Sequence, residues 1–526
     1  MNERADNKMR YNNPIIPGFY PDPSICRVGV DYYLVTSSFE YFPGVPLFHS
    51  RDLIHWRQIG HCLTRKSQLP LQGVAPSGGI WAPTIRYHEG IFYMTTTNMN
   101  GCGNFYVYTG NPSGEWSEPV WLSMGGIDPS LTFVGNKVYY TTNQSAPDGT
   151  PGISQVELDI NTGKMMGDIK FIWGGSGGKA PEAPHLYKIG TYYYLMIAEG
   201  GTFFTHMETI ARSKSPWGPF ESCPGNPILT NMQSNMLDVH CTGHGDLVED
   251  QNGNWWMVHL GIRIAQKYMS HIGRETFLSP VEWDKDGWPI VNHGKSVGLI
   301  SDGPCLPQIE VNPEVEMDHF EENRLALCWN YLRNPYPEDY SLSYRKSWMT
   351  LWGNSYRICD PDSPALIARR QKYFNCVMST LFEFSPKREN EEAGLVIFIT
   401  NEFYYKMTKR ILDGRMCLVL EKRAEDFFQI AACLEIEDKP LYIKVIADKL
   451  KYTFYYGYCA YEMVKFATAS ARFLACEVVG RCFTGTYVGI YASGNGCKSI
   501  APACFDYFGL GEQSEIGTYQ TDCKGS

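Results

Sequence analysis

The sequence lacks any apolar run approaching the roughly 20 residues that a membrane-spanning helix requires. Residues 1–13 are polar and contain no apolar stretch of the kind found in a secretory signal peptide. None of the 17 cysteines forms a C-x-x-C pair, and no zinc-like or disulfide-framework spacing occurs. Many unpatterned thiols are typical of a reducing compartment, so we expect a soluble cytoplasmic protein.

An excess of positive charge is also missing. The formal net charge is −10, and charged residues make up only 19% of the chain. This balance excludes the basic face typical of a nucleic-acid partner and disfavours adsorption to an anionic membrane. Aromatic residues reach 14%, which favours a β-rich fold because aromatic side chains fit strands well. A chain of 526 residues is too long for one compact core and predicts two or three domains.

Five segments in the first part of the chain follow one plan, in which an aromatic strand comes just after a turn. These strands are 31–36, 90–95, 137–142, 191–196 and 254–259. A glycine precedes or opens each of them, namely Gly29, Gly90, Gly135, Gly190 and Gly253. Glycine at these positions fits a hairpin turn that requires positive φ. The repeats are spaced by roughly 45–65 residues, which is compatible with four-stranded propeller blades.

A second short strand is expected just before each turn glycine. The residues that stand seven to nine positions before the five glycines are Asp22, Trp81, Asp128, Glu182 and His244. In a propeller the innermost strand of every blade runs along the central channel. If these segments are innermost strands, the five residues meet at one mouth of that channel. The alternative interpretation is an irregular all-β domain with scattered turn residues, since Asp-Pro is a common turn opener.

Motifs in these segments are similar to those of glycoside hydrolase family 43, the β-xylosidase and α-L-arabinofuranosidase family. The matching segments, in the order that the family shows, are 13–25, 37–46, 78–83, 126–131, 181–188, 198–202, 242–249 and 273–276. The resemblance implies a five-bladed β-propeller that hydrolyses glycosidic bonds with inversion at the anomeric carbon. It agrees with the number of repeats.

The resemblance assigns a role to each of three acidic residues. Asp22 would be the general base, Glu182 the general acid, and Asp128 the residue that orients the acid and tunes its pKa. An inverting glycosidase needs one carboxylate to activate water and one protonated carboxyl to protonate the leaving oxygen. A neighbouring carboxylate helps the acid to keep its proton, because like charges disfavour ionisation.

Four further residues match positions that form the pocket in the family. Phe39 would close the pocket beside the reacting sugar, and Arg274 would donate to sugar hydroxyls. Trp81 would stack on a sugar face at the same mouth; otherwise it packs within its blade. His244 would lie at the propeller axis, where some members hold a central ion, commonly calcium through waters. The resemblance therefore allows a structural calcium near His244, although the proposed chemistry requires no metal and no cofactor. Ala183 departs from the family, in which many members have glycine after the acid.

The sequence changes in character from about residue 300. Residues 301–316 are rich in proline, glycine and acidic residues and are interpreted as a linker, so we expect a propeller over 1–312 and a second domain over 313–526. Short alternating strands there predict a β-sandwich, at 379–384, 394–399, 416–420, 441–446, 452–456 and 487–491. This part resembles the concanavalin-like jelly roll of the family's β-xylosidases. Phe483 matches a sandwich residue that narrows the pocket in those enzymes; otherwise it is a core residue of the sandwich.

We therefore expect an all-β enzyme that releases xylose from the non-reducing ends of β-1,4-xylo-oligosaccharides. An α-L-arabinofuranosidase acting on arabinoxylan fragments, or a bifunctional enzyme, is the first alternative, because the motifs do not separate the two pentoses. A carbohydrate-binding propeller without activity is disfavoured because all three acids are present. Propellers that act on sucrose or fructans carry other motifs around their carboxylates. The resemblance also suggests a dimer or tetramer.

Overall fold

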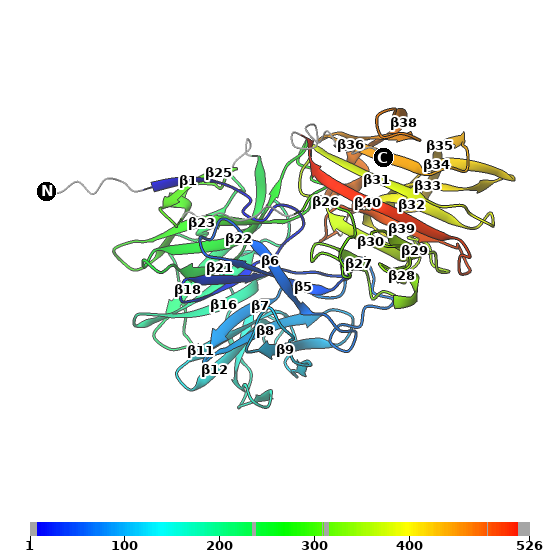
Figure 1. Ribbon diagram of the computed structural model, residues 1–526. Helices are drawn as coiled ribbons and strands as arrows, with labels where there is room; N and C mark the ends of the chain where they lie inside the picture. The colour runs from blue at the N-terminus through cyan, green and yellow to red at the C-terminus, as the bar shows by residue number, and fades with distance from the viewer. Residues whose placement is uncertain (1–7, 234–237, 308, 310–314, 481, 514–526) are drawn as a thin grey trace. The chain divides into compact units, whose positions relative to one another are not determined.

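Figure 1 shows the computed structural model of the chain, which describes residues 8–233, 238–307, 309, 315–480 and 482–513. The chain divides into two compact units. The first comprises residues 1–71, 78–264 and 274–312, and the second comprises 72–77, 265–273 and 313–526. In the described segments, no helix has the length and apolar character needed to cross a membrane.

Within the described residues, the core of the first unit consists of five antiparallel sheets of four or five strands, and the strands of each sheet come from one continuous stretch of the chain. Blade one contains β2 (Ser24–Val28), β3 (Asp31–Val35), β5 (Gly44–Ser50) and β6 (Arg57–Leu63). Blade two contains β7 (Thr84–His88), β8 (Ile91–Asn98), β9 (Gly103–Thr109) and β10 (Val120–Trp121). Blade three contains β11 (Ile127–Val134), β12 (Lys137–Asn143), β13 (Ile153–Asp159), β14 (Lys164–Met165) and β15 (Lys170–Trp173). Blade four contains β16 (Glu182–Ile189), β17 (Tyr192–Glu199), β18 (Met207–Ser213), β19 (Glu221–Ser222) and β20 (Leu229–Thr230). Blade five contains β21 (Val239–Glu249), β22 (Trp255–Arg263), β23 (Glu275–Trp283) and β24 (Pro289–Val291).

The first strand of every blade lies against the first strand of the next. β2 contacts β7, β7 contacts β11, β11 contacts β16, β16 contacts β21, and β21 contacts β2. These contacts close a ring, so the five strands are the innermost strands of a five-bladed propeller (Figure 1). The prediction from the repeats is confirmed.

The turn glycines explain why the repeats recur. Each lies between the first and second strands of its blade, and φ is 64° at Gly29, 86° at Gly90, 55° at Gly135, 56° at Gly190 and 83° at Gly253. A side chain is strained in this region, so glycine is favoured at every one of these hairpins.

The two ends of the first unit pair with each other. β1 (Lys8–Asn12) runs antiparallel to β25 (Ile300–Pro304). The expected linker over 301–316 was therefore placed too early, because its first residues alternate between exposed and buried and form a strand. Residues 308 and 310–314 of that predicted linker lie outside the described residues.

The second unit is a sandwich of two antiparallel sheets. One has the strand order β28-β29-β40-β31-β36-β37-β38, with β26 beside β40, and the other contains β35-β34-β33-β32-β39-β30-β27. The strands are β26 (Met317–Asp318), β27 (Asn330–Leu332), β28 (Tyr340–Ser341), β29 (Met349–Trp352), β30 (Ala365–Arg370), β31 (Cys376–Glu383), β32 (Glu392–Thr400), β33 (Phe403–Leu412), β34 (Arg415–Ala424), β35 (Phe427–Glu435), β36 (Leu441–Ala447), β37 (Lys451–Gly457), β38 (Val464–Ser470), β39 (Tyr487–Ser493) and β40 (Pro502–Glu512). One apolar core, which includes Leu395, Ile443 and Phe505, joins the two sheets.

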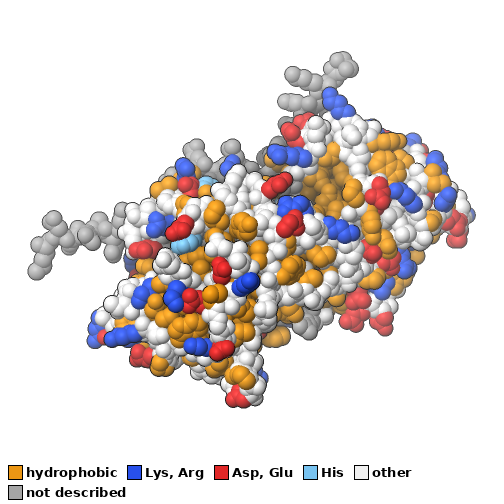
Figure 2. Space-filling view, turned by 90° about the horizontal axis from the view of Figure 1, so that it is seen from below, with side chains coloured by type: hydrophobic (Ala, Val, Ile, Leu, Met, Phe, Trp, Pro, Cys, Tyr) orange, Lys and Arg blue, Asp and Glu red, His pale blue; other side chains and the backbone are white. Residues whose placement is uncertain are grey.

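All six predicted sandwich strands are present, but several further strands were not predicted, and β33 is one of them. This strand carries a lysine, Lys406, that is buried between Glu392 and Glu421 and forms ion pairs with both. A charged residue at a core position breaks the apolar alternation on which the prediction depended. On the face of the molecule in Figure 2, acidic and basic side chains are interspersed among hydrophobic ones.

Candidate active site

Unusual backbone conformations occur where the innermost strands carry the predicted site residues. The angle φ is 55° at Asp22, 53° at Asp128, 52° at Ala183 and 50° at His244. The ladders of β11, β16 and β21 shift register at or near these positions. A bulge re-aims the side chains beside it, so these irregularities take the site residues out of the regular alternation of the strands.

Asp22 is 4% exposed and has three polar neighbours. Arg274 Nη1 donates to its Oδ1 over 2.6 Å, and the Ser37 hydroxyl donates to its Oδ2 over 2.6 Å. The Nδ1 atom of His244 lies 3.6 Å from Oδ1. Burial alone would raise the pKa of Asp22, but Arg274, His244 and Ser37 together hold it below its usual value. Asp22 is therefore ionised near neutral pH, as a general base must be.

Glu182 has the opposite electrostatic environment. Burial, followed by the negative charge of Asp22, raises the pKa of Glu182 to about 7, although Arg274 acts in the other direction. A carboxyl group with this pKa can hold a proton near neutral pH and donate it to a leaving oxygen. Two carboxyl groups whose environments drive their pKa values apart are the arrangement expected of a base and an acid.

Asp128 is linked directly to the residue after the acid. Its Oδ2 accepts a hydrogen bond of 3.2 Å from the backbone N–H of Ala183. Burial, and then the charges of Glu182 and Asp22, raise the pKa of Asp128 well above its usual value. Asp128 thus anchors the backbone next to Glu182. The predicted tuning of the acid by Asp128 stays a prediction, because the charge that raises the pKa of Glu182 in the structure is that of Asp22.

Two buried histidines, His206 and His244, lie near the carboxylate of Asp22. Burial lowers the pKa of His244 and lowers that of His206 to about 4, so both rings are neutral near pH 7. The Nδ1 atom of His206 lies 2.9 Å from the carbonyl oxygen of Cys241. A Cβ atom at Gly243 would lie 2.7 Å from the His206 ring, so glycine is required for this packing. The sequence analysis missed His206, because no repeat position marks it.

The other predicted pocket residues of the first unit form a continuous wall. The rings of Phe39 and Trp81 lie 6.4 Å apart, and the guanidinium carbon of Arg274 lies 5.6 Å from the centre of the Phe39 ring. A Cβ atom at Gly79 would lie 2.3 Å from the carbonyl oxygen of Phe39, so glycine lets the two segments approach. Arg274, which was predicted to bind sugar hydroxyls, donates here to Asp22 and joins this wall to the general base.

Phe483 belongs to the second unit, where its backbone N–H donates to the Ser77 hydroxyl over 2.9 Å. Its predicted place beside the sugar pocket stays a prediction. The described residues contain no group of three or more His, Cys, Asp or Glu side chains that could hold a metal ion. The axial calcium near His244 likewise stays a prediction.

Sequence reasoning also missed polar residues that contact the predicted ones. Ser37 lies within the quoted segment 37–46, but only the fold shows that its hydroxyl reaches Asp22. Arg86 and Asp246 form a buried ion pair with an N–O distance of 2.7 Å. The repeat could have pointed to Asp246, which lies two residues after His244 on β21, but no repeat position marks Arg86.

A propeller with an ionised carboxylate and a protonated carboxyl at its centre has the machinery of a glycoside hydrolase. A family model described as "Glycosyl hydrolases family 43" matches residues 11–289, and one described as "Beta xylosidase C-terminal Concanavalin A-like domain" matches residues 317–510. The chain belongs to glycosyl hydrolase family 43 and is a glycoside hydrolase.

Similar proteins match along almost the whole chain. "Non-reducing end alpha-L-arabinofuranosidase BoGH43B" of Bacteroides ovatus is 43% identical over 95% of this chain and 94% of its own length. "Xylosidase/arabinosidase" of Butyrivibrio fibrisolvens is 39% identical over 95% of this chain and 99% of its own length. The solved structure "Bacteroides ovatus Xyloglucan PUL GH43B" has a TM-score of 0.92 and 42% identity, and covers 96% of this chain and 100% of that one.

Proposed function

We propose that this enzyme is an exo-acting, inverting β-xylosidase that releases xylose from the non-reducing ends of β-1,4-xylo-oligosaccharides or arabinoxylan fragments. The observation that carries the proposal is that the pKa of Asp22 is lowered while the pKa of Glu182 is raised. The match of the second unit to a β-xylosidase domain supports the choice of sugar. Exo action is carried over from the "non-reducing end" in the name of the Bacteroides ovatus relative.

In the proposed reaction, Asp22 accepts a proton from water while the water oxygen forms a bond to the anomeric carbon. The bond from that carbon to the leaving oxygen breaks, and Glu182 gives its proton to the leaving oxygen. The products are xylose of inverted configuration and a shortened oligosaccharide with a new hydroxyl group. Asp22 ends protonated and Glu182 ionised, and exchange with solvent restores both.

The surrounding residues have distinct parts in this scheme. Arg274 and Ser37 keep Asp22 ionised through the hydrogen bonds that they donate to it. Asp128 fixes the backbone beside Glu182 through the N–H of Ala183. Trp81 offers a partly exposed ring against which the apolar face of a sugar packs, and the buried Phe39 lies beside it.

A second candidate function is α-L-arabinofuranosidase activity. The Bacteroides ovatus relative, at 43% identity over nearly the full chain, carries that activity in its name. Values of kcat/KM on 4-nitrophenyl β-D-xylopyranoside and 4-nitrophenyl α-L-arabinofuranoside decide between the two. A higher value for the arabinofuranoside would replace our first choice by the second.

Proton NMR of the first-formed product tests the stereochemistry. Hydrolysis of 4-nitrophenyl β-D-xylopyranoside should give α-xylose first, before mutarotation mixes the anomers. β-Xylose as the first product would contradict the inverting scheme. Glu182→Gln is the matched test of the acid, because turnover of xylobiose by this variant at the normal rate would remove Glu182 from its assigned role.

A further inference from the structure

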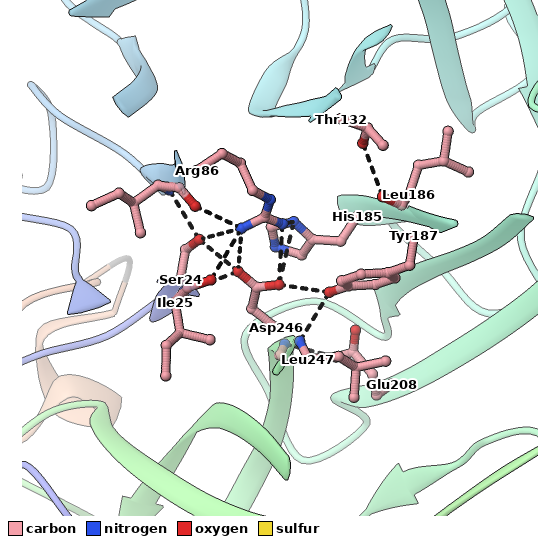
Figure 3. A network of polar contacts seen from close by, with 12 residues as sticks. Ser24, Ile25, Arg86, Thr132, His185, Leu186, Tyr187, Glu208, Asp246 and Leu247 are labelled. Carbon is pink, nitrogen blue, oxygen red and sulfur yellow. Dashed lines mark hydrogen bonds and ion pairs between the residues drawn. The ribbon is translucent and has the colours of Figure 1, made fainter. Parts of the chain in front are cut away.

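A buried polar network lies around the carboxylate of Asp246, which is fully buried (Figure 3). Its Oδ2 accepts hydrogen bonds from the Ser24 hydroxyl (2.6 Å), the Ile25 N–H (3.0 Å) and Arg86 Nη1 (2.7 Å). Its Oδ1 accepts from the Tyr187 hydroxyl (2.6 Å) and from Arg86 Nη2 (3.1 Å). One carboxylate on β21 is thereby bonded to β2, β7 and β16, the innermost strands of three other blades.

The charges of this network are balanced within it. The Arg86 guanidinium pairs with Asp246, and its Nη2 donates to the Nδ1 atom of His185 over 2.9 Å. Burial lowers the pKa of His185 to about 3, so its ring is neutral and Nδ1 is the acceptor. The ion pair of Arg86 and Asp246 therefore leaves no net charge at the centre of the network.

The fifth innermost strand, β11, is joined to the network through a hydrogen bond to β16. The Thr132 hydroxyl on β11 donates to the carbonyl oxygen of Leu186 on β16 over 2.9 Å. The Tyr187 hydroxyl in turn accepts from the N–H of Leu247 over 3.0 Å. All five innermost strands are thus joined by side-chain hydrogen bonds, as the close view in Figure 3 shows.

Residues of the network follow three of the site residues closely in the sequence. Ser24 is two residues after Asp22, and Asp246 is two residues after His244. Two residues of extended chain span about 7 Å. Ser24 and Asp246 therefore lie close to their site residues, although the backbone at Asp22 and His244 departs from a regular strand. His185 is three residues after Glu182, and the register shift in β16 between these two supplies the additional residue. The network therefore lies two or three residues along the innermost strands from the site residues.

We propose that Asp246 and Arg86 are positioning residues that hold the strands of Asp22 and Glu182 in the register required for reaction. The inference rests on the proposed function, because it concerns the geometry of that same pair of carboxyl groups. A catalytic group displaced by about 1 Å can cost about 10²-fold in rate. A buried ion pair can often be replaced by apolar residues without loss of stability, so stability alone gives little reason for these two charges.

Two variants test the proposal, with kcat and KM measured on xylobiose and the melting temperature measured for each. Asp246→Asn keeps the shape of the side chain but leaves Arg86 buried beside a neutral partner. The double variant Arg86→Met/Asp246→Asn removes both charges together and leaves neither unpaired, and the amide oxygen can still accept from the Ser24 hydroxyl and the Ile25 N–H. We expect both variants to lower kcat about 10²-fold while KM changes less than about threefold, and the double variant to melt within a few degrees of the wild type.

Glu421→Gln in the second unit is the matched control, because Glu421 is also a buried acid paired with two cations, Lys406 and Arg410. We expect it to lower the melting temperature and to leave kcat and KM unchanged well below that temperature. A folded double variant with wild-type kcat would overturn the proposal. Unfolding of the double variant would also overturn it, because the network would then be a requirement of the fold. Failure of the proposed function would differ from both, since the wild type itself would not hydrolyse xylobiose.

Discussion

Removal of the Ser37 hydroxyl tests how the general base is kept ionised. Ser37 donates a hydrogen bond of 2.6 Å to Oδ2 of Asp22 and helps to hold the pKa of Asp22 below its usual value. A hydrogen bond to a charged group contributes about 1.5 kcal/mol, which corresponds to about one pH unit. In Ser37→Ala the pKa of Asp22 should therefore rise, because the ionised form loses a donor.

The assay is kcat/KM for xylobiose between about pH 3 and pH 9 at constant ionic strength. The reaction needs Asp22 ionised and Glu182 protonated, so the profile is a bell that falls at low pH with Asp22 and above about pH 7 with Glu182. We expect Ser37→Ala to move the acid limb up by about one pH unit and to leave the alkaline limb in place.

The adjacent serine provides a control for this experiment. Ser38 is also buried, but its hydroxyl accepts from the N–H of Val45 and not from a group at the base. Ser38→Ala should leave both limbs where they are in the wild type. An acid limb that stays in place in Ser37→Ala would refute the reasoning, and so would a shift of the same size in Ser38→Ala.

Four further outcomes are expected. Glu182→Gln should lower kcat/KM for xylobiose by about 10² to 10⁴-fold and lower it less for a nitrophenyl glycoside, whose leaving group needs little protonation; equal losses on both substrates would contradict the acid role. Ala183→Gly should raise the free energy of unfolding by up to about 1 kcal/mol in urea denaturation, because φ at Ala183 is 52° and glycine adopts it without strain. Trp81→Ala should raise KM for xylobiose by about tenfold while Trp81→Phe restores most of the affinity, and an unchanged KM in the alanine variant would exclude sugar stacking. Dialysis against EDTA should leave kcat/KM unchanged, since the proposed steps use only protein groups, and a loss restored by calcium would oppose that expectation.

The blades could be predicted from the sequence because their signal is local. A turn glycine with positive φ and an aromatic second strand recur in every blade, and Gly29 and Gly253 mark the first and the last. The position of a residue within the repeat then placed Asp22, Asp128 and Glu182 on three innermost strands. The positions two residues after Asp22 and His244 in the same repeat would also have identified Ser24 and Asp246 as residues of the innermost strands.

Other features could not be predicted because they depend on contacts between distant residues. Arg86 and Asp246 are 160 positions apart, and neither has a local pattern that names the other as its partner. The left-handed backbone at Ala183 is equally hidden, since alanine is a residue that rarely adopts it. In the second unit, Lys406 is stabilised inside a sheet by Glu392 and Glu421, which lie on other strands.

The pairing of β1 with β25 has a consequence for how activity reports on folding. Asp22 belongs to the first blade, whereas His244 and Arg274 belong to the last or lie at its edge, so the environment of the base is assembled across the seam where the ring closes. Opening of this seam would separate Asp22 from both partners at once while each blade kept its own hydrogen bonds. Turnover is therefore a sensitive reporter of ring closure, because it would vanish in a partly open propeller whose β-sheet content is still native.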